Sequence, residues 1–502
     1  MELQLYKYTP TSIWWRLVLW LHSVPPRGVF HLGVDSMNVR VLIGILLAAA
    51  PAFAQAPPAT GASGTPAQDV TSTPAQDTSS ASAPDPERWN AYYQATSIGD
   101  MHGYFHSPYS GAFSLQDYPE HDTSLTATVF LGLQLFSNTQ LYVDPELAGG
   151  RGFSGVDGMA NAPNGELPRV ASATPKPYLA RAYITQDFGF GDARESFESD
   201  ENRLAGTRPM TRYSISVGRF TVTDFFDDNH FSHDPRTQFM GWAIMYNGAW
   251  DYPADTRGYT WGWIHEFHTR SWSVRYGSAA EAKVANGLRF DRRLFRDRGD
   301  MFEGERDMSI HGRKGAVRLL GFLLHTDSGS YAEALALARQ TGTRPDVTAT
   351  RKVARLKYGT GISADQEITR DVGVFLRLGW NDGKTESFAF TAMDRLAEGG
   401  VSVTGARWRR PGDTVATALT VGGISGVHAS YLAAGGYDFL IGDGRLNYGS
   451  EYVWESYYSA KVTRQLAASF DLQYVVNPAY NRDRGPLWIE SIRLHLAGAL
   501  KK

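Results

Sequence analysis

Two short segments carry residue types that bind metals or phosphate. Residues 265–268 (HEFH) share residue types with a zinc-protease motif, but that motif places its second histidine four residues after the first, on a helix. In a strand, His265 and His268 point to opposite faces. Residues 379–385 (GWNDGKT) have three residues between their glycines where a phosphate-binding loop needs four. Neither segment predicts catalysis, and 379–385 is better read as a hairpin turn.

The rest of the sequence gives little indication of a metal site or of thiol chemistry. Asp224, Asp227 and Asp228 are close enough in sequence to share a calcium ion, but their spacing is not that of an EF-hand loop. The absence of cysteine removes disulfides, cysteine zinc sites and thiol catalysis. An outer-membrane hydrolase would need a Ser and a His together on the lipid-facing side, and no such pair is evident. We expect no metal, no cofactor and no enzymatic activity.

The segment that organises the chain is 371–383 (DVGVFLRLGWNDG). With the two-residue period of a strand, alternate residues from Val372 to Trp380 form an apolar face, and the opposite face carries Phe375 and Arg377. In a soluble sandwich the apolar face would point inward. In a transmembrane barrel it would meet lipid, and Arg377 would point into a lumen. This strand alone leaves both architectures open.

Similar alternating segments recur from residue 88 onward, separated by Gly, Asn, Asp and Pro. Trp and Tyr stand at many strand ends, as expected for the aromatic girdles at the two membrane interfaces. One short helix is predicted within a loop, at 331–339. The predicted strands are 89–98, 123–135, 140–143, 178–188, 212–220, 241–246, 259–267, 271–276, 316–325, 352–361, 371–383, 387–393, 401–408, 415–422, 429–434, 445–448, 452–462, 468–476 and 487–500.

Composition excludes several classes of protein. The chain has 502 residues and a net charge of -3, so it lacks the concentrated basic surface that nucleic acid requires. Mean hydropathy is -0.31. Beyond the amino terminus no run of about 18 apolar residues occurs, which argues against a helical membrane bundle. The absence of a long apolar run does not argue against a β-barrel, because only alternate residues of each strand face lipid.

The region before residue 88 divides into three parts. Residues 37–54 have a basic region at Arg40, an apolar run and the sequence AFA at 52–54, which predicts export with cleavage after Ala54. Residues 1–36 precede this signal, and our interpretation is a misassigned start codon. Residues 55–87 are rich in Ala, Pro, Ser and Thr and repeat TPAQD, so we expect a disordered periplasmic tether.

Residues 88–502 are expected to form an all-β, transmembrane antiparallel β-barrel. At roughly 26 residues per strand and connection they hold about 16 strands, and 18 is the alternative because bacterial barrels have even counts. Periplasmic turns should be short and extracellular loops long. The first long excursion covers 144–170, and a second follows Phe220.

A channel selective for sugars needs hydrogen-bonding groups for hydroxyls and ring faces against which a pyranose can lie. Arginine supplies a rigid fork of donors, carboxylates accept, and aromatic side chains supply the surface. Strand parity gives as lumen candidates Arg181, Tyr183, Arg318, Arg355, Lys357, Phe375, Arg377, Glu455, Tyr457, Lys461, Arg493 and His495. Loop residues that could fold inward as a constriction are Glu146, Asn164, Glu166, Asp227, Asp228 and Arg236. The alternative for the first set is that these side chains line the water-filled lumen and pair with one another for structural reasons only. The alternative for the second set is that these residues lie in ordinary surface loops.

Several long segments resemble the carbohydrate-selective porin (OprB) family, and the resemblance extends over 88–500. The segments are 144–155 (DPELAGGRGFSG), 163–166 (PNGE), 218–239 (GRFTVTDFFDDNHFSHDPRTQF), 247–262 (NGAWDYPADTRGYTWG), 378–391 (LGWNDGKTESFAFT), 439–449 (FLIGDGRLNYG) and 477–486 (NPAYNRDRGP). The resemblance implies a 16-stranded outer-membrane barrel, passive sugar-selective diffusion without cofactor or catalysis, and a channel able to work as a monomer. Such barrels usually end on an aromatic residue that the assembly machinery reads, whereas this chain ends HLAGALKK, with Leu500 in that place.

We therefore expect a cell outer-membrane channel for passive diffusion of glucose-like mono- and oligosaccharides into the periplasm. Its expected partners are small sugars, outer-membrane lipid and lipopolysaccharide, and the barrel-assembly machinery. A general or differently selective porin is one alternative. A secreted all-β sugar-binding protein is another, and it would turn its apolar strand faces inward.

Overall fold

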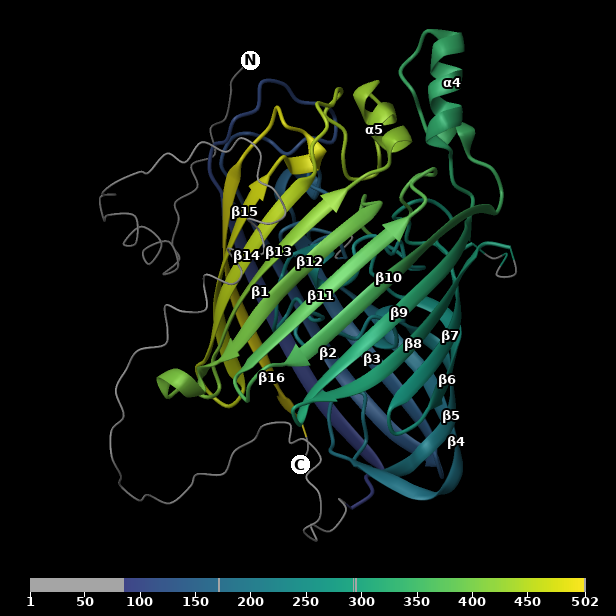
Figure 1. Ribbon diagram of the computed structural model, residues 1–502, viewed down its shortest axis with the longest axis vertical. Helices are drawn as coiled ribbons and strands as arrows, with labels where there is room; N and C mark the ends of the chain where they lie inside the picture. Colours follow the sequence, from purple (N-terminus) through teal and green to yellow (C-terminus); the bar gives the residue numbers. More distant parts are fainter. Residues whose placement is uncertain (1–84, 170–171, 292, 294–295, 501–502) are drawn as a thin grey trace, which may run out of the picture. The chain divides into compact units, whose positions relative to one another are not determined.

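The computed structural model describes residues 85–169, 172–291, 293 and 296–500. The expected extension at 1–36, the signal peptide at 37–54 and nearly all of the tether at 55–87 lie outside the described residues. Sixteen strands of the described part close into an antiparallel barrel (Figure 1). Each strand pairs with its neighbours in sequence, and β16 closes the ring against β1. The predicted fold class is confirmed, with 16 strands and not 18.

The elements have the following bounds. The strands are β1 (Trp89–His102), β2 (Glu120–Phe136), β3 (Thr139–Arg151), β4 (Lys176–Phe197), β5 (Gly206–Phe220), β6 (Thr260–His268), β7 (Trp272–Ala280), β8 (Arg298–Ile310), β9 (Arg313–Thr326), β10 (Arg355–Glu367), β11 (Val372–Asn381), β12 (Arg395–Thr404), β13 (Thr414–Gly423), β14 (Glu451–Lys461), β15 (Leu466–Val476) and β16 (Leu487–Ala499). The helices are α3 (Trp242–Met245), α4 (Tyr331–Thr341) and α5 (Gly426–Ala433), with short 3-10 segments η2 (Phe153–Gly155), η3 (Val222–Asp224), η4 (Thr348–Thr350), η5 (Gly405–Trp408) and η6 (Pro478–Tyr480).

Connections differ between the two ends of the barrel. At one end the turns are short, at 137–138, 198–205, 269–271, 311–312, 368–371, 405–413 and 462–465. At the other end the loops are long, at 103–119, 152–175, 221–259, 281–297, 327–354, 382–394, 424–450 and 477–486. Because outer-membrane barrels keep their short turns in the periplasm, we call the first end periplasmic and the second extracellular.

The apolar strand faces point outward. On β11, Leu376 and Leu378 are 48% and 41% exposed, whereas the alternate residues Phe375 and Arg377 are 4% and 0% exposed. β2 repeats the pattern, since Leu131 on its outer face is 41% exposed. A soluble sandwich would bury the leucines and expose the arginine. The orientation is that of a barrel in lipid, and it contradicts the alternative of a secreted sugar-binding protein.

Two predicted strands are helices. Residues 241–246 contain α3, a buried apolar turn within an extracellular loop. Residues 429–434 lie largely in α5, whose N-cap Ser425 accepts a hydrogen bond from the backbone N of His428 at 3.1 Å. Both segments are short and rich in apolar residues, and periodicity alone does not separate strand from helix in such segments.

Two other predicted strands are absent, and one observed strand was not predicted. Residues 387–393 and 445–448 belong to extracellular loops and form no strand. Conversely, β8 was not predicted. Its outer face carries Gly304 and Arg306, and its inner face carries Glu303 and Glu305, so hydrophobic alternation does not mark it.

The predicted helix at 331–339 is confirmed as α4. Its N-cap Ser330 accepts from the backbone N of Glu333, and Gly342 ends it with φ at 67°. Within the described residues, every helix is too short or too polar to cross a bilayer. Helices α4 and α5 both lie in loops at the extracellular end (Figure 1).

Candidate functional site

Loop 221–259 folds into the barrel and is held there by charged strand residues. Nε of Arg377 on β11 lies 2.9 Å from Oδ1 of Asp227, and its Nη1 lies 3.0 Å from Oε1 of Glu398 on β12. Its Nη2 donates to the carbonyl oxygen of Ser232 at 2.5 Å. These three charged side chains are buried. Arg377 therefore points inward as predicted, but it fastens a loop and has no surface open to water.

Two further lumen candidates bind the backbone of the same loop. The carboxylate of Glu455 on β14 accepts hydrogen bonds from the backbone N of Met240 and of Gly241, at 2.5 and 3.0 Å. Nη1 of Arg493 on β16 donates to the carbonyl oxygen of Pro235 at 2.7 Å. Both strand side chains are buried, so they too lie under the loop.

Apolar and basic contacts complete this attachment. The ring of Phe239 packs against Phe375 and Tyr457, with centroids 5.6 and 5.1 Å apart. Nζ of Lys357 on β10 lies 2.9 Å from Oδ2 of Asp251, and both side chains are 3% exposed. The loop thus covers the inner wall along β10, β11, β14 and β16.

Loop 152–175 also folds inward and meets loop 221–259. Nδ2 of Asn164 donates to Oδ2 of Asp100 on β1 at 2.8 Å, which attaches the loop to the wall. Oε2 of Glu166 accepts a hydrogen bond from Thr126 on β2 at 2.5 Å. The two loops join where the backbone N of Gly165 donates to the carbonyl oxygen of Met240 at 2.7 Å. Together they narrow the lumen.

One arginine links both loops to the barrel wall. Nη2 of Arg236 lies 3.0 Å from Oε2 of Glu146, and its Nε lies 3.1 Å from Oε2 of Glu166. Tyr178 and Tyr259 donate hydrogen bonds to Oε1 of Glu146. We call these five residues the Arg236 cluster. Glu146 was expected in the long loop at 144–170. Strand β3 instead continues to Arg151 and places Glu146 on the inner wall of the barrel.

Arg181 on β4 extends this polar surface. Its Nε and Nη2 bind the two carboxylate oxygens of Asp224 at 2.7 and 2.5 Å, and its Nη1 lies 3.4 Å from Oδ2 of Asp144. Its guanidinium lies 5.5 Å from the ring centroid of Tyr259. The neighbouring candidate Tyr183 is buried in an aromatic group with Tyr142, Phe220 and Phe225.

The exposed edges of this region carry alternating charge. The side chains of Arg236 and Arg181 are 12% and 13% exposed, and that of Asp224 is 23% exposed. Burial opposes the charge of Arg236, but Glu166 and Glu146 raise its pKa well above the ordinary value. In Asp234, burial likewise opposes ionisation, while Arg236 lowers the carboxyl pKa overall. Arg236 and Asp234 therefore stay charged at neutral pH.

A second charged surface lies on the inner faces of β6 to β10. Arg275 on β7 binds Glu266, Glu303 and Glu305 at 2.5, 3.0 and 2.5 Å. Arg318 on β9 binds Asp365 on β10 at 2.5 Å. The loop carboxylate Asp228, whose side chain is 66% exposed, lies 4.0 Å from His233.

Of the remaining candidates, Arg355 and Lys461 lie at the two ends of the barrel, whereas His495 is close enough to Arg236 and Glu166 to interact with them electrostatically. Arg355 is at the extracellular end of β10, where it pairs with Glu333 of α4 at 2.9 Å. Lys461 is at the periplasmic end of β14 and is exposed. Nδ1 of His495 lies 2.8 Å from Oγ1 of Thr96.

Sequence reasoning named Glu146, Glu166 and Arg236 and missed the residues that surround them. Asp224, Tyr178 and Tyr259 were absent from the candidates. Tyr178 and Tyr259 are the first residues of two predicted strands, a position typical of the aromatic girdles, and Asp224 was considered only as a metal ligand. Their convergence follows from the paths of the two loops.

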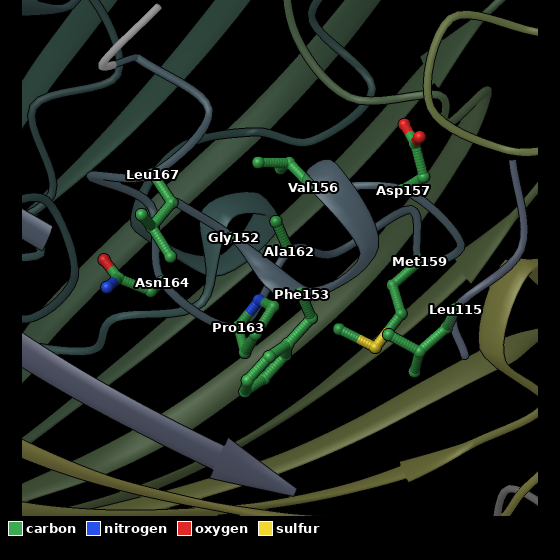
Figure 2. Close-up of a pocket in the computed structure, with 10 residues that line it drawn as sticks. All are labelled: Leu115, Gly152, Phe153, Val156, Asp157, Met159, Ala162, Pro163, Asn164 and Leu167. Atoms are coloured by element: carbon green, nitrogen blue, oxygen red, sulfur yellow. The ribbon is translucent and has the colours of Figure 1, made fainter. Parts of the chain in front are cut away.

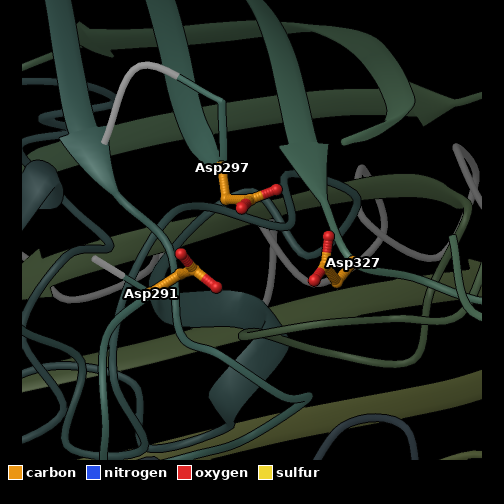
Figure 3. A group of neighbouring side chains, drawn as sticks. All are labelled: Asp291, Asp297 and Asp327. Carbon is orange, nitrogen blue, oxygen red and sulfur yellow. The ribbon is translucent and has the colours of Figure 1, made fainter. Parts of the chain in front are cut away.

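One group of three carboxylates in the described part of the chain could hold a metal ion. Asp291, Asp297 and Asp327 converge from two extracellular loops (Figure 3). Nη2 of Arg293 lies 2.7, 2.8 and 2.5 Å from them. The guanidinium therefore already supplies the compensating charge. The calcium alternative at Asp224, Asp227 and Asp228 is weakened as well, since the first two carboxylates bind arginines.

A small apolar pocket lies under loop 152–175, lined by Leu115, Phe153 and Met159 among others (Figure 2). It has about 10 Å³ of space, room for at most one water molecule. It is too small for a sugar. The histidines of 265–268 also form no site, because His265 contacts Tyr213 on the outer face and His268 contacts Ser273 on the inner face.

Comparisons with known proteins agree with this architecture. The model of the family described as "Carbohydrate-selective porin, OprB family" matches residues 120–496. The fold is similar to the high-pH structure of Pseudomonas putida OprB, with 16% sequence identity and a TM-score of 0.62 over 82% of this chain and 94% of that chain.

Weaker similarities occur to other solved structures. Acinetobacter baumannii OccAB1 is 10% identical, with a TM-score of 0.45 over 83% of this chain and 97% of that chain. Pseudomonas aeruginosa OccK2 in complex with glucuronate is 9% identical, with a TM-score of 0.41 over 82% and 98%. No curated protein matches the chain. Since the family model covers most of the chain, this outer-membrane barrel belongs to the OprB family of carbohydrate-selective porins, which are channels and not enzymes.

Proposed function

We propose that the protein carries glucose-like monosaccharides and short oligosaccharides passively across the outer membrane into the periplasm, past the Arg236 cluster. The observation that supports this proposal is the meeting of Arg236, Glu146 and Glu166 with Tyr178 and Tyr259 where the two inward loops join. Arg236 and Tyr178 are partly exposed and can offer donors and a ring to a solute, whereas Glu146, Glu166 and Tyr259 are buried and hold them in position. Membership of the family supports sugars as the substrate class.

The ion pairs suit a neutral solute. Arg236 and Arg181 are each bound to carboxylates, so their attraction for free anions is reduced while their outward N–H groups still meet water. A sugar hydroxyl can replace that water and hydrogen-bond Arg236, Arg181 or the partly exposed carboxylate of Asp224. Binding must remain weak, because a solute that stays in a pore also blocks it.

Conductance through planar bilayers tests this function. Purified protein should carry an ion current that glucose and a disaccharide reduce in a concentration-dependent way, because a sugar at the cluster excludes ions. An amino acid of similar size should have little effect. Equal permeation of all three solutes in a liposome-swelling assay would indicate a general porin instead.

We also propose that the chain reaches the outer membrane after cleavage at Ala54 and is inserted by the barrel-assembly machinery, where it contacts lipid and lipopolysaccharide. The AFA sequence at 52–54 and the outward leucines support these steps. Mass spectrometry of the mature protein should give an amino terminus at Gln55. A terminus upstream of Met37 would contradict the proposed signal peptide.

A further inference from the structure

The turn at 198–205, which joins β4 to β5 at the periplasmic end, folds into the barrel. Nδ2 of Asn90, on the inner face of β1, donates to the carbonyl oxygen of Arg203 at 2.8 Å and to Oγ of Ser199 at 3.0 Å. Leu204 is 2% exposed. In Figure 1 the ends of β4 and β5 curve across the lower rim of the barrel. The turn therefore lies against the inner face of β1, beyond β3 and β2 in the ring, and not in the periplasm.

A bulge explains this bend. The pairing of β4 with β5 shifts between Phe190 and Arg194, so β4 contains extra residues there. Gly191 within the bulge has a φ of 74°, a conformation that side chains other than glycine disfavour. Bulges bend a hairpin and increase its twist. The bend directs the 198–205 turn toward the lumen.

The turn is joined to the residues around the Arg236 cluster through one carboxylate. Nδ2 of Asn202 donates to Oδ2 of Asp144 at 2.8 Å. The same oxygen lies 3.4 Å from Nη1 of Arg181, whose other nitrogens bind Asp224. Asp144 is fully buried. The position of the turn is therefore coupled to that of the exposed Arg181 edge.

Glu201, at the tip of this turn, has an exposed side chain. Its carboxylate forms no hydrogen bond or ion pair with another described residue, and only its backbone N is bound, to Oδ1 of Asp200 at 2.9 Å. The charged groups that act on it are Asp234 and Arg236 of loop 221–259, Asp200 of its own turn, and Arg181 of β4. It therefore faces the same region as the Arg236 cluster, from the periplasmic side.

We propose that the 198–205 turn is the periplasmic lip of the constriction and that the Glu201 carboxylate acts on solutes leaving the Arg236 cluster. It accepts hydrogen bonds from sugar hydroxyls and repels anions. The sugar contact rests on the proposed function, whereas the effect on ions does not. Desolvation within the barrel, together with Asp234, raises the pKa of Glu201 to about 7, although Arg236 opposes the shift. Its charge therefore changes near neutral pH.

The natural absence of cysteine provides a direct test. A Glu201→Cys variant in planar bilayers is treated with a positively charged thiosulfonate reagent from the periplasmic side. Modification should lower single-channel conductance about two-fold, because the added group lies in the narrow part of the pathway. Glu198→Cys is the matched control, since Glu198 is an exposed carboxylate of the same turn, and its modification should leave conductance unchanged.

Ion selectivity gives an independent measurement on the conservative variants. In a salt gradient, the wild type should gain cation preference between about pH 5 and about pH 9, as Glu201 ionises. Glu201→Gln should lose most of that gain, and Glu198→Gln should keep it. The proposal is overturned if Glu201→Gln matches the wild type at both pH values, or if modification of the two cysteine variants has equal effects. Absence of a sugar-induced block in the wild type would instead reject the sugar function and leave the position of Glu201 standing.

Discussion

Nε of Arg377 on β11 lies 2.9 Å from Oδ1 of Asp227 in an extracellular loop, and both side chains are buried inside the barrel. The two residues are 150 positions apart in the chain. Their ion pair fixes loop 221–259, which carries Arg236, against the wall. The shape of the pathway therefore depends on residues that do not touch the solute.

Replacing Arg377 with Gln should release this loop. Asp227 and Glu398 would remain buried without their cation, which destabilises a protein by roughly 3–5 kcal/mol. Conductance should rise and fluctuate more, because the loop no longer stays against the wall. Thermal unfolding in detergent and single-channel recording measure the two effects. Arg355→Gln is the control, since its partner Glu333 is 39% exposed and the expected loss is below about 1 kcal/mol. Equal effects of both substitutions would contradict the role of Arg377.

Arg236 should be sensitive even to lysine. Lysine keeps the charge but cannot bind Glu146 and Glu166 through a fixed fork of donors. Loss of one charge-assisted hydrogen bond to a sugar weakens binding by roughly ten-fold, at about 1.5 kcal/mol. Analysis of the current noise that sugar induces measures sugar affinity, and it should show this loss for Arg236→Lys. The ion selectivity of Arg236→Lys should be nearly unchanged. Arg236→Gln should shift selectivity toward cations as well. An unchanged sugar affinity in both variants would remove Arg236 from the binding surface.

His428 should make the outer loops sensitive to alkaline pH. Its Nδ1 and Nε2 each lie 3.1 Å from a carboxylate, Asp394 and Asp438, and its ring stacks on Tyr331 of α4. Burial opposes its charge, but Asp394 and then Asp438 raise the pKa from 6.5 to about 9. The cation therefore joins three extracellular loops.

Because the folded pKa is raised, this stabilisation is complete below about pH 6.5 and is lost as pH rises through about 9, with a size of roughly 3 kcal/mol. Hydrogen exchange in α4 and α5, corrected for the intrinsic pH dependence, should accelerate over that interval. In His428→Gln, exchange should be fast at every pH. An acceleration of the same size in the variant would show that another group titrates.

Leu376→Arg should impair assembly. Leu376 is 48% exposed on the outer face of β11, and an arginine facing hydrocarbon costs about 2–4 kcal/mol near the bilayer centre. The fraction of heat-modifiable barrel recovered from outer membranes should fall. Asp371→Arg, in the periplasmic turn 368–371 outside the hydrocarbon, is the control and should assemble normally. Normal recovery of Leu376→Arg would mean that this face does not contact lipid.

Much of the architecture could be predicted from strand periodicity. Leu376, Arg377 and Leu378 alternate in type, and the period of two residues places them on opposite faces whatever the neighbouring strands do. The inward direction of all twelve lumen candidates follows from the same local rule. Periodicity failed at β8, where charged residues occupy both faces, and at α5, where an apolar run has no visible period.

The contacts of those inward residues were decided by the tertiary structure. Parity places Arg377, Glu455 and Arg181 in the lumen equally well, yet the first two lie buried under a loop and the third keeps part of its surface exposed. No sequence pattern predicted that the turn at 198–205 folds inward, since short turns at that end normally stay in the periplasm. Side-chain direction is a local property of each strand. Which surfaces remain open to water depends on the paths of loops held by partners more than a hundred residues away.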